Sequence, residues 1–393
     1  MRALADGSVR ESLMTCFQEA GMPAGVWTND VLDRMRGTGD AVGDAAIAEI
    51  YELGRQEEVR QALLAFGKNG DALPAGLPSR LQRYFEQTSA LPEWADRELI
   101  ERGRVLLGRY EALVVSTLLC ASLPLCYGCG DGAQVLARSQ RLTSGVYRRL
   151  METSQFVVDV LDDGGLEPRG RGIRSAQKIR LLHATMRYHV GRQGDWTRAW
   201  GLPVNQEDLA GTLMSFSVVI PRGLGRLGVD LPPRDRDAFF HVWRIVGYVL
   251  GVDDRLNPSS FDEGAELFDT ILRRQQKSSE AGIALTKGVL DFIREVLPGP
   301  VFAGAGPTLI RHLIGDQAAD LVKVPPADLT KSALQAGSVL NYGYGKAGDT
   351  APLAAKAASE LGLVVFKNGL RLSNKGRRYE WQVPTGLTES HPS

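Results

Sequence analysis

The 393-residue chain has no surplus of either charge, because 46 basic residues balance 46 acidic ones. Such a balance gives no electrostatic footprint for DNA, RNA or an anionic membrane surface. We therefore expect no nucleic-acid partner. Hydrophobic residues make up 44% of the chain and charged residues 23%, which is ordinary for a globular protein with a large buried core.

Cysteine is scarce, with four residues in the whole chain. Three of them, Cys120, Cys126 and Cys129, lie in an apolar stretch, which favours buried thiols in a reducing compartment over a disulfide framework. Cys126 and Cys129 form a CxxC, but Gly130 stands where a c-type haem needs histidine. No second CxxC completes a zinc site. We interpret these cysteines as packing residues.

The N-terminus has no apolar secretion signal and no twin arginine, which predicts a cytoplasmic protein. The longest apolar stretch, residues 112–127, is shorter than a membrane-spanning helix needs, and it contains Pro124. We interpret it as a buried helix that ends near the proline. We therefore expect no stable membrane insertion.

Apolar residues at helical spacing are abundant. They predict helices over residues 9–20, 27–36, 44–66, 78–88, 93–126, 131–161, 175–191, 206–219, 235–251, 262–277, 281–297 and 306–316. The fold class is therefore all-α, with one large helical domain over residues 1–338. Residues 339–393 read as an extension, in which Asn368-Gly369 between apolar runs predicts a small β-hairpin before a disordered tail.

Two patterns leave an alternative open. Residues 216–219, Phe-Ser-Val-Val, would also fit a strand. The glycines Gly223, Gly225 and Gly228 then match GxGxxG, but a dinucleotide site needs a helix to open at these glycines. Pro232-Pro233 follows instead, so we predict a loop between helices.

The segment from Ser175 to Val190 carries the most specific chemistry. Arg180, His183 and Arg187 are spaced by three and four residues, so they share one helix face. An imidazole between two cations suits an iron porphyrin. The imidazole can bind the iron and the guanidiniums can fork onto propionate carboxylates. On the preceding helical segment Arg149, Glu152, Thr153 and Phe156 also share a face.

The pattern Arg180-x-x-His183-Ala184-x-x-x-Arg187 resembles the signature of the latex-clearing (rubber oxygenase) family. That family belongs to a wider group of b-type haem oxygenases, which includes a fungal enzyme acting on mycophenolic acid intermediates. Arg149 and Thr153 match two further family positions. The family's distal lysine is replaced by Glu152, and its proposed acid/base glutamate falls near Ala133.

Other stretches also resemble this family, and the likeness runs from about Trp27 to about Lys323. They are residues 91–103, 120–128, 205–217 and 243–258, which makes about 91–258 the core of the domain. The resemblance implies a globin-like helical core that binds haem b. His183 would be the iron ligand, Arg180 and Arg187 would fix the haem or its supporting helix, and Glu152, Arg149 and Thr153 would line the distal side.

The implied function is oxygenation or oxidative cleavage of a C=C bond in a hydrophobic small molecule by dioxygen. Three alternatives remain open. Glu152 and Arg149 could serve a haem peroxidase or peroxygenase, since a carboxylate beside a cation can move a proton across bound peroxide. The protein could also be a haem-binding sensor or carrier without turnover, or a helical protein with no cofactor. The sequence does not predict the oligomeric state.

Overall fold

The computed structural model describes residues 27–64, 67, 71–138, 146–167, 169–192, 194–296 and 304–327, and within them all regular structure is helical. The all-α prediction is confirmed. The predicted helix over 9–20 and the predicted hairpin after residue 338 lie outside the described residues. In chain order the elements are α2 (Asn29–Arg36), α3 (Ala41–Glu52), α4 (Gln56–Leu64), α5 (Ser79–Thr88), α6 (Arg97–Thr117), the π-helical turn η1 (Leu118–Ser122), α7 (Leu123–Tyr127), α8 (Ala133–Arg138), α9 (Val146–Leu161), α10 (Arg171–Val190), η2 (Arg198–Trp200), α11 (Gln206–Ser217), α12 (Val219–Arg226), α13 (Pro233–Leu250), η3 (Asp254–Leu256), α14 (Phe261–Gln275), α15 (Glu280–Val296), α16 (Ala305–Ile314) and α17 (Asp316–Leu321).

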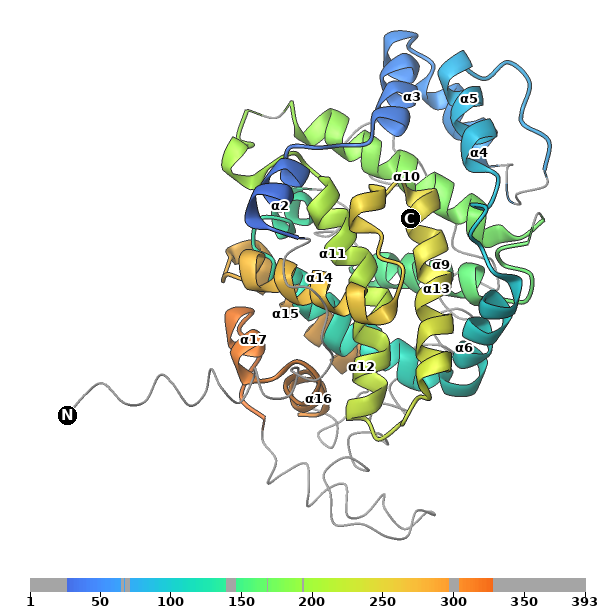
Figure 1. Cartoon of the computed structure of the whole chain (residues 1–393). Helices are drawn as coiled ribbons and strands as arrows, with labels where there is room; N and C mark the ends of the chain where they lie inside the picture. Colours follow the sequence, from blue (N-terminus) through green and yellow to red (C-terminus); the bar gives the residue numbers. More distant parts are fainter. Residues whose placement is uncertain are drawn as a thin grey trace.

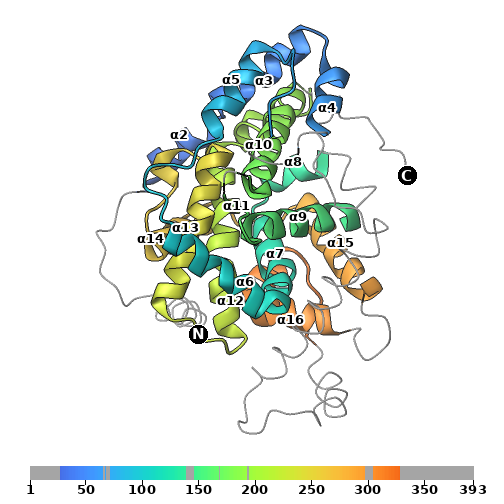
Figure 2. The same ribbon diagram turned by 90° about the vertical axis from the view of Figure 1, so that its right-hand side faces the viewer.

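Helix α10 lies between two layers of the molecule. On one side it packs against α3, which in turn packs against α4 and α5 (Figure 1). On the other side it packs against α9 and α13, which belong to the larger helical body with α6, α11 and α12 (Figure 2). Leu181 and Ala184 of α10 join the smaller hydrophobic cluster, while Ile173, Ala176 and Ile179 join the larger one. The helix therefore has almost no polar face exposed to solvent.

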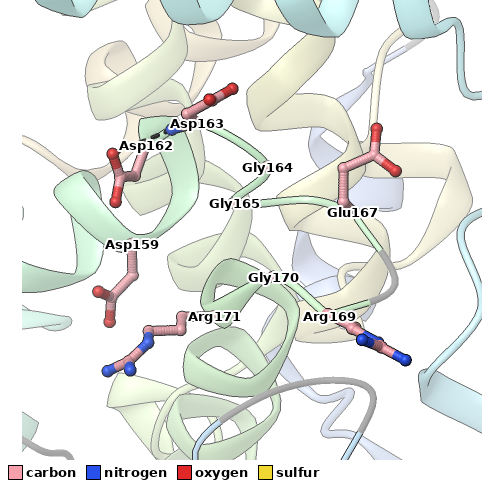
Figure 3. Close-up of a pocket in the computed structure, with 9 residues that line it drawn as sticks. All are labelled: Asp159, Asp162, Asp163, Gly164, Gly165, Glu167, Arg169, Gly170 and Arg171. Atoms are coloured by element: carbon pink, nitrogen blue, oxygen red, sulfur yellow. Dashed lines mark hydrogen bonds between the residues drawn. The ribbon is translucent and has the colours of Figure 1, made fainter.

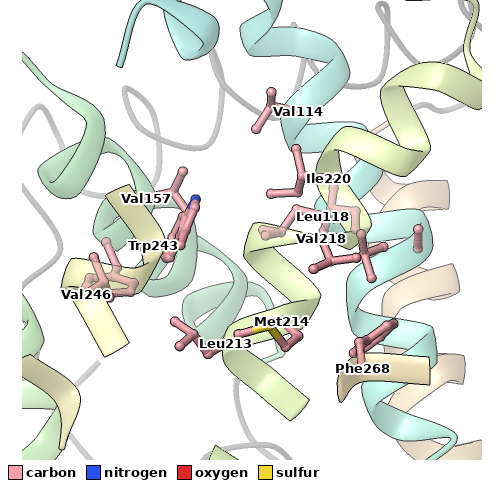
Figure 4. Close-up of a cluster of buried hydrophobic side chains, with 14 of the residues drawn as sticks. Val114, Leu118, Val157, Leu213, Met214, Val218, Ile220, Trp243, Val246 and Phe268 are labelled. Atoms are coloured by element: carbon pink, nitrogen blue, oxygen red, sulfur yellow. The ribbon is translucent and has the colours of Figure 1, made fainter. Parts of the chain in front are cut away.

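The larger hydrophobic core is centred on Trp243 of α13, which is fully buried. Its ring stacks on Phe216 of α11 at a centroid distance of 4.7 Å, and Phe156 of α9 meets it edge-on at 6.0 Å. Figure 4 shows Trp243 beside Val157, again from α9. Offset and edge-on aromatic pairs of this kind add stability beyond the area that they bury. The core thus fixes α9 against α11 and α13.

Local sequence signals account for most helix boundaries. Thr28 caps α2 by accepting a hydrogen bond from the Val31 amide. Asn205 caps α11 in the same way through the Asp208 amide, at 3.0 Å. The predicted single helix over 44–66 is wrong, because the chain breaks between α3 and α4 at Gly54, whose φ is +64°. A glycine adopts this left-handed conformation without the steric cost that other residues carry.

The Gly223–Gly228 stretch differs from its prediction. Residues 219–226 form α12, so the predicted loop is wrong, as is the strand alternative for residues 216–219. A Cβ placed on Gly223 would collide with Thr117 of α6. The glycine therefore allows α12 to approach α6 closely, and the Pro232-Pro233 pair starts the next helix, α13.

The apolar stretch around residues 112–127 is longer as a helix than expected. The continuous helical run Arg109–Tyr127 has the length and composition of a membrane span, with a mean hydropathy of 1.4. The prediction that it is too short is therefore wrong. The run includes Pro124, which sits in the first turn of α7 where its missing N–H is tolerated. Inside the molecule 61% of the run is buried, so it acts as a core helix.

Candidate haem site on α10

The predicted iron ligand lies on a helix that is held along its whole length. Tyr84 of α5 donates a hydrogen bond to the Gln177 carbonyl at 2.7 Å, and Gln177 donates to Thr88 at 2.7 Å. Both bonds are buried, and buried side-chain bonds of this kind lock one helix against another. Burial also raises the pKa of Tyr84 far above its usual value, so its hydroxyl stays a donor.

His183 is partly exposed, although nearly all its neighbours on α10 are buried. Ile179 lies four residues before His183, Leu182 one residue before it and Met186 three residues after it. All three are 6–7% exposed. Leu182 and Met186 pack with Val135 of α8 in a small cluster separate from the main core. His183 is thus a partly exposed residue among buried apolar residues of the same helix.

The two arginines that flank His183 are paired with protein carboxylates. Arg180 forks onto Asp40 through Nε and Nη2, each at 2.7 Å. Arg187 binds Asp44 through Nε at 2.7 Å and lies 3.8 Å from Asp40 through Nη2. Of the two roles expected for these arginines, holding the helix is the one that these contacts support.

Asp40 and Asp44 were missed in the sequence. They lie at the N-terminus of α3, about 140 residues before their partners, and no helical spacing links them to α10. Burial alone would raise the pKa of Asp40, but hydrogen bonds from Arg180 and the charges of Arg180 and Arg187 lower it below its usual value. The carboxylate therefore stays ionised.

The predicted distal residues lie on α9, which packs directly against α10. Glu152 is 3% exposed and Thr153 is half-buried. Arg149 belongs to the same helix, but its side chain is outside the described part of the structure. Ala133, where the family's acid/base carboxylate would fall, is buried on α8. Glu152 is thus a buried carboxylate on the helix that packs against α10.

The residues around His183 fit a haem in their chemistry. An imidazole nitrogen is a common protein ligand of haem iron. Because a porphyrin supplies the equatorial ligands itself, one axial side chain is enough. The lack of any group of three or more histidine, cysteine, aspartate or glutamate ligands among the described residues is therefore compatible with haem. In addition, Arg187 is 8% exposed, and its Nη2 makes no hydrogen bond within the described residues. It could still donate to a propionate.

A separate cavity lies at the turn between α9 and α10. It has a volume of about 300 Å³ and is lined by charged side chains and glycines of residues 159–171 (Figure 3). Asp159 is one of the lining residues and accepts hydrogen bonds from Gln155 and Ser175. None of the five predicted site residues whose side chains the structure describes lines this polar cavity, so it is distinct from the site predicted around His183.

Two other sequence patterns have structural roles. Burial raises the pKa of Cys126 to about 11 and that of Cys129 well above its usual value, which fits inert thiols. In the stretch 205–217, Glu207 is fully buried and accepts hydrogen bonds from Arg36, Arg274 and Gln275. That cluster ties α2 and α14 to the start of α11.

Comparison with known proteins places these features in a family. The rubber oxygenase of Streptomyces sp. (strain K30) is 26% identical over 321 residues, which cover 76% of this chain and 75% of that protein. The structure of latex clearing protein LCP in the closed state superposes with a TM-score of 0.72 at 21% identity, covering 89% of this chain and 95% of that one. The similarity in structure supports the same all-α fold.

The family model named "ER-bound oxygenase mpaB/B'/Rubber oxygenase, catalytic domain" matches residues 106–339, more than half of the chain. The match includes α9 with Glu152, α10 with His183 and its two arginines, and the capped helix α11. The predicted resemblance is confirmed, and the chain belongs to the mpaB/rubber oxygenase catalytic-domain family.

Proposed function

We propose that this protein is a b-type haem oxygenase that uses dioxygen to cleave or oxygenate a C=C bond of a hydrophobic small molecule. The observation that supports the proposal is His183, which lies on a clamped, buried helix inside the segment that matches the oxygenase family. The known relative is a rubber oxygenase by name. When bound, a haem would supply the redox chemistry of the cleavage.

The proposed site residues form two groups, one on α10 and one on α9, and those on α10 would hold the haem. His183 would hold the iron through an imidazole nitrogen, and the buried side chains of Ile179 and Met186 would help to exclude water. The Arg187 Nη2 group would donate a hydrogen bond to a propionate, in a site with little competing solvent. Each of these roles depends on α10 keeping its place between α3 and α9.

On the α9 side, Glu152 would hold or move a proton at its carboxylate oxygens. A carboxylate that is only 3% exposed has little water to compete for that proton. Thr153 and Arg149 would line the same side and position the substrate. Because Glu152 replaces a lysine of the family, we expect no nitrogen ligand from this position in the resting protein.

The first test is the absorption spectrum of the purified protein and of the protein titrated with haem b. We expect a Soret band that saturates at one haem per chain. A protein that does not bind haem would refute the proposal. Dioxygen uptake is then measured with short isoprenoid alkenes and with polyisoprene latex, and faster uptake with the short alkenes is the expected result.

The buried carboxylate at Glu152 gives some support to a second function, a haem peroxidase or peroxygenase. The oxidant distinguishes the two, because this alternative requires turnover only when peroxide is added. A haem-loaded protein that consumes neither oxidant with any substrate would instead be a sensor or carrier.

A further inference from the structure

The carboxylate of Asp40 contacts both arginines that flank His183. Its Oδ1 accepts from Arg180 Nη2 and its Oδ2 from Arg180 Nε, each at 2.7 Å. The same Oδ2 lies 3.8 Å from Arg187 Nη2. Because Arg180 comes three residues before the histidine and Arg187 four residues after it, one carboxylate spans the two turns that carry the imidazole.

Three glycines leave the space that this contact occupies. A Cβ on Gly43 would lie 2.5 Å from Asp40 Oδ2, and one on Gly39 would lie 2.8 Å from Asp44 Oδ2. A Cβ on Gly251, at the end of α13, would collide with the Arg180 guanidinium. The backbone of two separate segments, the start of α3 and the end of α13, is therefore shaped around these charges.

Backbone carbonyls complete the arrangement. Arg180 also donates to the Val249 carbonyl at 3.1 Å, and Arg187 donates to the Val204 carbonyl at 2.9 Å. Gln206 bridges the carbonyls of Gly39 and Gly251, at 2.9 and 3.0 Å. The guanidiniums are thus oriented from several sides, and a bidentate arginine–carboxylate pair is stiff in its geometry as well as strong.

We propose that Asp40 is a positioning residue for His183, which fixes the height and rotation of the imidazole on α10 by holding Arg180 and Arg187 together. Asp40 is 5% exposed, and its side chain is more buried than those of its two partners. It would act on His183 through these two arginines. Its influence on the iron rests on the proposed function, whereas its influence on the helix does not.

Two measurements on Asp40→Asn test the proposal. The asparagine keeps the shape but loses the charge and cannot accept both guanidinium hydrogen bonds. In the haem-free protein we expect faster amide hydrogen exchange over residues 180–187. In the haem-loaded protein we expect about 10- to 100-fold weaker haem binding and an altered ferric spectrum, since partners that orient a metal ligand typically have effects of this size.

The matched control is Asp269→Asn. Asp269 forks onto Arg222 at 2.7 and 2.9 Å, from α14 to α12, so it loses a similar bidentate pair away from α10. This control should leave exchange over residues 180–187 and haem affinity unchanged. Equal effects of the two variants would overturn the proposal, because Asp40 would then stabilise the fold in general.

If Asp40→Asn does not fold, Asp40→Glu replaces it, because the longer side chain keeps the charge but displaces the carboxylate. For Asp40→Glu we expect amide exchange and a haem affinity between those of the parent and those predicted for Asp40→Asn. Parental exchange and parental affinity in a folded Asp40 variant would overturn the proposal. A parent protein that binds no haem would refute the proposed function, and the exchange measurement would then decide on Asp40.

Discussion

At the scale of single residues, two histidines on one helix have different surroundings. His183 is partly exposed among buried apolar residues of α10, whereas the Nε2 of His189 is hydrogen-bonded to the Tyr51 hydroxyl at 2.7 Å. Desolvation and the charge of Arg192 lower the pKa of His189 below its usual value. The two side chains therefore form a natural pair of test and control.

Replacing His183 by alanine should abolish stoichiometric haem binding and leave the helical fold intact. The axial bond is the main covalent hold on a b-type haem, so we expect a loss larger than the roughly 100-fold typical of a supporting residue. Haem titration followed by the Soret band measures it. His189→Ala should bind haem like the parent, and a parental Soret band in His183→Ala would mean that another residue binds the iron.

Replacing Glu152 by glutamine should keep haem bound and remove most turnover. The amide preserves the shape but cannot accept a proton, and losing a general base typically costs about 100- to 10,000-fold in rate. Asp159→Asn is the control, since Asp159 is a buried carboxylate two turns further along α9. Parental turnover of Glu152→Gln across neutral pH would exclude Glu152 as the base.

At the scale of elements, the end of α13 and the charged contacts on α10 depend on one another. Gly251 closes α13 with φ +76° and ψ +30°, the left-handed conformation that glycine adopts at helix ends. The same residue leaves room for the Arg180 guanidinium. A helix end 71 positions along the chain thus helps to hold the turn that carries His183.

Replacing Gly251 by alanine should destabilise the protein by about 2–4 kcal/mol, from left-handed strain of about 1–2 kcal/mol plus displacement of Arg180. Gly228→Ala is the matched control, because its φ is +84° but a Cβ there meets nothing within 4 Å. Chemical denaturation gives both values. If the two variants lose the same free energy of unfolding, Arg180 yields to the new methyl group without cost.

At the scale of the whole molecule, stability depends on buried charges that join distant helices. Asp208 on α11 contacts Arg36 on α2 at 3.0 Å. Desolvation raises the pKa of Asp208 from 3.8 to about 6, and the neighbouring Glu207 adds to this effect while Arg36 opposes it. Asp208 should therefore make stability depend on pH in the range where the folded and unfolded proteins bind protons differently.

We expect the free energy of unfolding to fall as pH rises from about 4 to about 6 through the contribution of Asp208. In this interval the folded protein holds a proton that the unfolded chain has released, so stability decreases with rising pH. Because the side chain is 17% exposed, we expect a change of about 1 kcal/mol rather than the full value of the shift. Asp208→Asn should remove this slope in denaturation curves measured from pH 4 to 7. If Asp208→Asn leaves the pH dependence of the free energy of unfolding unchanged, other titratable groups cause that dependence.

Most of the helices, and the order of side chains along each, follow from local sequence patterns. Arg180, His183 and Arg187 share a face because the helical repeat is local, and the cap at Thr28 depends on neighbouring residues only. The family pattern on α10 was visible for the same reason, since its spacing is fixed by one turn of helix. The break at Gly54 was missed because glycine inside a helical pattern is tolerated as often as it ends one.

The contacts of these side chains follow from the way the helices pack in three dimensions. Asp40 meets Arg180 from 140 residues away, and nothing in the local spacing of either residue indicates the pairing. Local spacing also does not explain Gly223, which is needed because α6 and α12 approach closely there. Nor does it explain Trp243, which is buried among rings from α9 and α11. Such contacts arise from the packing of whole helices, which depends on all their side chains together rather than on any one stretch of sequence.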